Sequence, residues 1–95
     1  MCVSVPNVHQ VLFYEYVKDI VERRGPHREA HLGRIRAEKA AGRVVMAGAL
    51  GDPPHGAAIV FADTDPEAVA DFARTDPYVE AELVTGWRIE PWMLV

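Results

Sequence analysis

The sequence predicts an α+β fold of the ferredoxin-like type, in which four antiparallel strands form one sheet and two helices cover one of its faces. Strand-like and helix-like segments follow one another in the order β-α-β-β-α-β. With right-handed crossovers, this order closes into a split βαβ sheet. The chain has 95 residues, so we expect a single domain over residues 1–95, one sheet face of which needs cover from another subunit.

The first strand is expected over residues 11–17, which are dense in aromatic and β-branched side chains. Their apolar run is nearly continuous, which is typical of a strand in the middle of a sheet. Residues 18–25 are interpreted as a charged connection.

The first helix is expected over residues 28–41, which are rich in Ala, Leu, Arg, Glu and Lys and are followed by a glycine. At about 100° per residue, Leu32 and Ile35 mark one face of it, with Arg28 and His31 on or beside that face. A separate strip suited to close packing comprises Ala30, Ala37 and Ala41. The helix therefore carries two polar residues toward a buried region.

Residues 43–50 and 57–62 predict an antiparallel hairpin, because both are apolar and the intervening residues 51–56 are rich in Gly and Pro. Gly48 on the first of these strands indicates a close approach of the backbone to a neighbouring group.

Two Asp-Pro pairs predict helix starts in the second half of the chain. Asp65 is a suitable N-cap with proline at the first helical position, and the helix is expected to continue to about Arg74. The same pattern at Asp76 predicts one short turn of helix. Alternation over residues 83–92 predicts the last strand.

Composition excludes several classes of function. The 10 basic and 14 acidic residues give a formal net charge of −4, so we expect no nucleic-acid partner. No apolar run approaches the roughly 18 residues of a membrane span, so we expect no membrane contact. Cys2 is the single cysteine and cannot form an internal disulfide. With no leader sequence visible, a cytoplasmic location is expected.

No metal or cofactor is expected. His27 and His31 have the spacing of two ligands on one helical face, but the glutamate of the zinc-protease motif does not follow the first histidine. No glycine-rich phosphate loop is present. Cys2 is not expected to be a nucleophile, because nothing in the sequence lowers its pKa.

Four stretches, in order, resemble the YciI-like (YCII-related) family, and they span almost the whole chain. They are Arg28-Glu29-Ala30-His31-Leu32, Ala41-Gly42-Arg43-Val44-Val45-Met46-Ala47-Gly48, Asp76-Pro77-Tyr78-Val79 and Glu90-Pro91-Trp92. The resemblance implies a subunit that pairs into a dimeric α/β barrel, with a site built on a His–Asp pair that maps onto His31 and Asp76. The chain departs from the family pattern at Ala49, where proline is common, and at Ala57, where a small hydroxyl residue is frequent. These departures leave the substrate open.

Elementary chemistry supports the same pair. An imidazole held by a carboxylate keeps one tautomer and gains basicity, so His31 is expected to act as general base with Asp76 orienting it. Arg28 lies one turn before His31 and would hold an anion. Tyr78 and Gly48 are the further candidates for substrate contact. The alternatives are that Asp76 only caps its helix, that His31 is a satisfied core histidine, and that Tyr78 only packs in the core or at its rim.

The sequence therefore predicts a homodimeric or larger enzyme that needs no cofactor and transfers a proton on a small anionic, aromatic or enolisable compound. The family resemblance implies a lyase or isomerase, similar to dehydrohalogenases. The alternative is a non-catalytic domain of the same fold that binds a small ligand in the same cleft.

Overall fold

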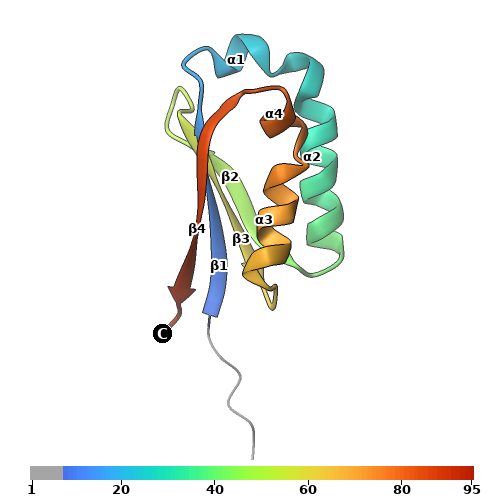
Figure 1. The fold of residues 1–95 in the computed structure, drawn as a ribbon, viewed down its shortest axis with the longest axis vertical. Helices are drawn as coiled ribbons and strands as arrows, with labels where there is room; N and C mark the ends of the chain where they lie inside the picture. The colour runs from blue at the N-terminus through green and yellow to red at the C-terminus, as the bar shows by residue number, and fades with distance from the viewer. Residues whose placement is uncertain (1–7) are drawn as a thin grey trace, which may run out of the picture.

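The computed structural model describes residues 8–95 and contains the six expected elements in the expected order (Figure 1). Cys2 lies outside the described residues. The elements are β1 (Val8–Tyr16), α1 (Ile20–Arg23), α2 (Gly25–Ala40), β2 (Val44–Leu50), β3 (Gly56–Ala62), α3 (Pro66–Arg74), α4 (Pro77–Glu80) and β4 (Val84–Met93).

The four strands form one antiparallel sheet in the order β2-β3-β1-β4. Strand β1 lies inside the sheet, as its continuous apolar run predicts. Its Leu12 is level with Ile59 of β3 on one side and with Ile89 of β4 on the other. The α+β ferredoxin-like prediction is confirmed.

The main helices lie on one face of the sheet, again as predicted (Figure 1). Helix α2 packs against β2, and α3 packs against β1 and β4. Between the sheet and these helices lies the main core, which comprises Leu12, Tyr14, Val44, Ala57, Ile59, Phe61, Val69, Phe72 and Ala73. In residues 8–95, no helix combines the length and the apolar character needed to cross a membrane.

Three local expectations are wrong. A Cβ added to Gly48 would meet no atom within 4 Å, so no neighbouring group in residues 8–95 closely approaches the backbone there. Part of the supposed charged connection forms the short helix α1, in which Ile20 is buried against Tyr78 and Leu83. A single buried residue leaves no periodic signal that would predict such a helix. The strip of Ala30, Ala37 and Ala41 is exposed. Helix α2 lies over an edge strand and turns only a narrow face inward, so its small residues face away from the sheet.

Both Asp-Pro helix starts are confirmed. Asp65 has extended backbone angles and its side chain accepts a hydrogen bond from the Glu67 N–H. Asp76 does the same for the Tyr78 N–H. In each case proline occupies the first turn, where its missing N–H costs nothing. The second cap brings a carboxylate beneath α2, because α4 packs against that helix.

Candidate functional site

The side chains of His31 and Asp76 meet in the interior of the protein. His31 Nδ1 lies 2.9 Å from Oδ1 and 3.0 Å from Oδ2 of Asp76, across a separation of 45 residues in sequence. His31 is 4% exposed and Asp76 is fully buried. The prediction that these two residues come within hydrogen-bond reach is confirmed.

The Asp76 carboxylate accepts hydrogen bonds from three directions. Besides His31, the Tyr14 hydroxyl donates to Oδ2 at 2.8 Å and the Tyr78 backbone N–H donates to Oδ1 at 2.9 Å. A buried carboxylate is costly unless such donors surround it. The Asp76 side chain is therefore both the cap of α4 and the acceptor at the centre of a buried polar cluster.

This arrangement assigns the tautomer of the neutral His31 ring. Because Asp76 accepts, Nδ1 carries the proton and donates it, which leaves Nε2 with a free lone pair. Nε2 lies on the other side of the ring from the carboxylate. The nitrogen able to accept a proton is thus turned away from Asp76.

Aromatic rings surround the pair. The Tyr78 ring stacks on the His31 ring with centroids 3.8 Å apart and planes 9° from parallel. Tyr16 meets Tyr78 edge to face at 6.0 Å. Tyr14 and Tyr16 are separated by one residue on β1, so both side chains lie on the same sheet face. In the sequence, Tyr14 and Tyr16 belong to the predicted first strand, and nothing there marks them as members of the site.

The phenols of the cluster stay protonated. Burial raises the pKa of Tyr14 far above its ordinary value, and the charge of Asp76 and its hydrogen bond to Tyr14 act in the same direction. Burial also raises the pKa of Tyr16, with Tyr78 the next largest cause. The pKa of Tyr78 is raised by burial as well, although Arg24 and Arg28 oppose the shift. At neutral pH these hydroxyls can therefore donate hydrogen bonds.

His31 lines a cavity of about 240 Å³ between α2, the sheet and α4. Three other predicted residues, Arg28, Tyr78 and Gly48, line the same cavity. Asp76 is not part of the lining and lies behind His31. Arg24, which lies in the stretch expected to be a charged connection, also lines the cavity. Its place beside the cavity could not be predicted, because α2 begins at Gly25 rather than at residue 28 as expected.

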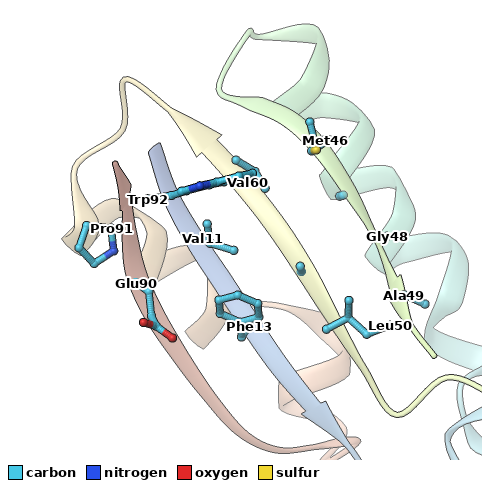
Figure 2. A pocket seen from close by; sticks show the side chains of 12 residues that line it. Val11, Phe13, Met46, Gly48, Ala49, Leu50, Val60, Glu90, Pro91 and Trp92 are labelled. Atoms are coloured by element: carbon cyan, nitrogen blue, oxygen red, sulfur yellow. The ribbon is translucent and has the colours of Figure 1, made fainter. Parts of the chain in front are cut away.

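A second, larger hollow of about 560 Å³ lies on the sheet face that carries no helices. Figure 2 shows its floor, where Val11, Phe13, Val60 and Trp92 project from neighbouring strands. The lining of this hollow is mainly apolar, and its one carboxylate, Glu90, is paired with Arg88 at 2.8 Å. The His31 cavity is therefore the candidate functional site, although the hollow on the open face is larger.

Part of β2 borders both hollows. Ala47, Gly48 and Ala49 line the His31 cavity and also the apolar hollow on the open face. The wall between them is one strand thick at this point.

Residues 8–95 contain no group of three or more His, Cys, Asp or Glu side chains placed to hold a metal ion.

The YCII-related domain model matches residues 8–93, which include every element of the fold. The chain belongs to the YCII-related family. This finding confirms the resemblance drawn from the four sequence stretches. No match was found in a search of curated proteins.

One solved structure similar to this YCII-related chain is 5-chloro-2-hydroxyhydroquinone dehydrochlorinase from Burkholderia phenoliruptrix AC1100, in complex with 2,5-dihydroxybenzoquinone. The similarity has a TM-score of 0.74 at 18% sequence identity and covers 88% of this chain and 92% of that chain. At this identity the comparison shows that the two proteins share a fold.

Proposed function

We propose that this YCII-related protein is a cofactor-independent enzyme of the lyase or isomerase type that moves a proton on a small anionic compound. The observation that carries the proposal is the buried His31–Asp76 pair, which leaves one imidazole nitrogen free beside a cavity containing Arg28. Proton transfer near neutral pH needs a base of this kind, positioned and desolvated. We also propose that it acts in the cytoplasm.

His31 Nε2 would remove a proton from an acidic C–H or ring hydroxyl of the bound compound. The resulting imidazolium is stabilised by Asp76, which already accepts the Nδ1–H hydrogen bond. Arg28 would balance the negative charge left on the substrate. Tyr78, stacked on the imidazole, holds the plane of the ring.

Two outcomes are then open to the substrate anion. In an isomerisation, the imidazolium returns its proton to a different atom of the same molecule. In an elimination, the electron pair of the broken C–H or O–H bond forms a C=C or C=O bond, and a leaving group such as chloride departs from a saturated carbon with its own bonding pair. For a chlorinated hydroquinone, that carbon is the C–Cl carbon of the keto tautomer. The proton on Nε2 then passes to water. The dehydrochlorinase activity named for the structurally similar protein favours elimination.

The test uses 5-chloro-2-hydroxyhydroquinone and measures chloride release by the wild type and by His31→Ala. We expect His31→Ala to lower turnover by roughly 10²–10⁴. His27→Ala is the matched control, because His27 is on the same helix but does not line the cavity. Full activity in His31→Ala, with the substrate still bound, would assign the protein to the non-catalytic ligand-binding class.

If the wild type leaves this compound unchanged, the same pair of proteins is compared with other enolisable acids. The measurement is then loss of the C–H proton signal in D₂O by NMR. Exchange that is equally fast with and without His31 contradicts the proposed role of the histidine as general base.

We further propose that the protein is a homodimer paired through the open sheet face. This face exposes the large apolar residues Met46 and Trp92, which are 57% and 47% exposed. A stable interface of this kind would bury on the order of 2,000 Å². Because β2 borders both hollows, such a partner would also support the wall of the His31 cavity.

Light scattering tests the dimer. We expect a mass of about 21 kDa, twice the 10.5 kDa of one chain, and a shift toward the monomer in Met46→Glu. Val21→Glu is the control, because Val21 is also an exposed apolar residue but lies on α1, away from the open face. A wild-type mass near that of one chain at micromolar concentration contradicts pairing.

A further inference from the structure

Two arginines of the described chain differ from all the others. In residues 8–95, Arg24 and Arg28 have no hydrogen-bond or ion-pair partner among the side chains, whereas each remaining arginine does. The partnered arginines are Arg23, Arg34, Arg36, Arg43, Arg74 and Arg88. The two without partners are the two that line the His31 cavity.

Their placement brings the two cations together. Arg24 is the N-cap residue of α2, and Arg28 lies four residues later, so both belong to one side of the helix. Like charges at this spacing are unfavourable by a few tenths of a kcal/mol in an isolated helix. No carboxylate at the cavity lining offsets that repulsion.

The remaining polar groups of the cavity supply no negative charge. Asp76 lies behind His31, and its oxygens accept from His31, Tyr14 and the Tyr78 backbone. Tyr16 and Tyr78 are neutral phenols near pH 7, and burial raises the pKa of each still further. The cavity is therefore positive before any ligand enters, and the first turn of α2 adds the positive end of its dipole.

We propose that Arg24 and Arg28 together bind a carboxylate of the substrate, which makes the substrate class a small carboxylic acid. The planar guanidinium forms paired hydrogen bonds with a carboxylate, and two of them can hold both of its oxygens. The acid-bearing molecule would then lie between the arginines and His31, against the ring of Tyr78. This inference rests on the proposed function, because it takes the His31 cavity to be the reaction site.

Size restricts the class further. The cavity of about 240 Å³ is smaller than the roughly 300–1,000 Å³ of sites for drug-sized ligands. A single six-membered ring or a short acyclic chain with one carboxylate suits it. The half-buried Leu32 and Ile35 at its wall provide an apolar surface for the carbon part of such a molecule.

The experiment measures binding of benzoate by NMR, with the His31 ring signals as reporter. Benzamide is the neutral molecule of the same shape, and inorganic phosphate is the competing anion. We expect benzoate to bind at least about tenfold more tightly than benzamide, as the charged partner of an arginine does. Equal affinity for the two compounds, or no binding of benzoate, would overturn the proposal.

Variants locate the effect. Arg24→Gln and Arg28→Gln are each expected to weaken benzoate binding by about tenfold or more. Arg23→Gln removes the neighbouring charge, which pairs with Asp19 outside the cavity, and is expected to leave binding unchanged. Benzoate affinity that is unaffected by Arg24→Gln contradicts the shared site. If phosphate binds at these arginines more tightly than benzoate, the proposed carboxylic acid is wrong and the substrate class is a phosphate ester.

Failure of this inference can be distinguished from failure of the proposed function. Benzoate binding that depends on both arginines, together with full turnover in His31→Ala, would keep the carboxylate site and exclude the general base. Turnover of a carboxylate-bearing substrate that depends on His31 but is unaffected by Arg24→Gln would keep the base and exclude the shared carboxylate site.

Discussion

The chain contains two Asp-Pro helix starts with nearly identical local structure and different surroundings. Asp65 has backbone angles of −64° and 136°, and Asp76 has −69° and 131°. Each carboxylate accepts from the N–H two residues later. Asp65 is exposed, whereas Asp76 is fully buried and also binds His31 and Tyr14.

The difference shows how a local motif becomes a candidate site. At Asp65, the carboxylate is solvated by water, and its structural role is to cap α3. At Asp76, the same geometry places a charge where only protein donors can compensate it. The hydrogen bonds from Tyr14 and His31 are the compensation, and the orientation of the imidazole is the result.

The largest expected effect comes from Asp76→Ala. This substitution leaves the Tyr14 hydroxyl and His31 Nδ1 without their acceptor and also removes the cap. We expect the free energy of unfolding to fall by about 3–5 kcal/mol, as when one partner of a buried pair is removed. A urea titration measures the change. A loss of only about 1 kcal/mol, the value of a cap alone, would mean that the buried partners add no stability.

Tyr14→Phe separates one buried partner from the cap. It removes the hydroxyl that donates to Asp76 at 2.8 Å, and we expect a loss of about 1.5–3 kcal/mol in the free energy of unfolding, typical of a hydrogen bond to a charged group. Tyr16→Phe is the matched control, because the Tyr16 hydroxyl has no hydrogen bond within residues 8–95. Equal losses in the two variants would contradict a specific contribution from the Tyr14–Asp76 bond.

Alkaline pH tests the tyrosines around Asp76. The folded-state pKa of each is raised above its unfolded value near 10, so the neutral phenols stabilise the fold fully below that pH and lose this contribution as pH rises through the folded pKa. Above pH 10 we expect about 1.4 kcal/mol of stability to be lost per pH unit for each phenol that stays neutral. Unfolding by urea at pH 8 to 11 measures the loss. Tyrosinate absorbance that appears near pH 10 in the folded protein would contradict it.

The smallest effect is expected for Asp65→Ala. Loss of an exposed N-cap costs about 1 kcal/mol, and the residue has no buried partner to leave unsatisfied. Urea titration measures the change, while the NMR signals of the His31 ring report on the site. Those signals should stay where they are in the wild type. A shift comparable to that caused by Asp76→Ala would show that the two caps are coupled.

Much of the fold was predictable because its signals are local. Both proline starts, the central apolar strand and the final alternating strand can be read over a few adjacent residues. Helix α1 could not be predicted, since its one buried residue, Ile20, makes contact with residues near the other end of the chain. Ala30, Ala37 and the C-cap residue Ala41 of α2 are exposed rather than closely packed. Helical periodicity shows which residues share a face of the helix, but it does not show which face lies against the sheet.

The site was predicted in part. His31, Asp76 and Arg28 stood out through their chemistry and through the family resemblance. Tyr14 gave no such signal, because an apolar strand is a sufficient explanation for a tyrosine until its hydroxyl is seen to reach Asp76. Arg24 lay in a run of charges in which nothing distinguishes a solvated arginine from one that lines a cavity.

The polar cluster joins residues that are far apart along the chain, since Tyr14 is 62 positions from Asp76 and His31 is 45. Contacts of such separation form only after the intervening segments have closed, and closure has an entropic cost that local structure does not offset. A fragment with a complete β1 and α2 would therefore contain the His31 imidazole but would lack Asp76, which orients the ring. During refolding, the Nδ1–H signal of His31 should appear only after the last third of the chain has docked. The time at which this signal appears therefore reports when folding is complete.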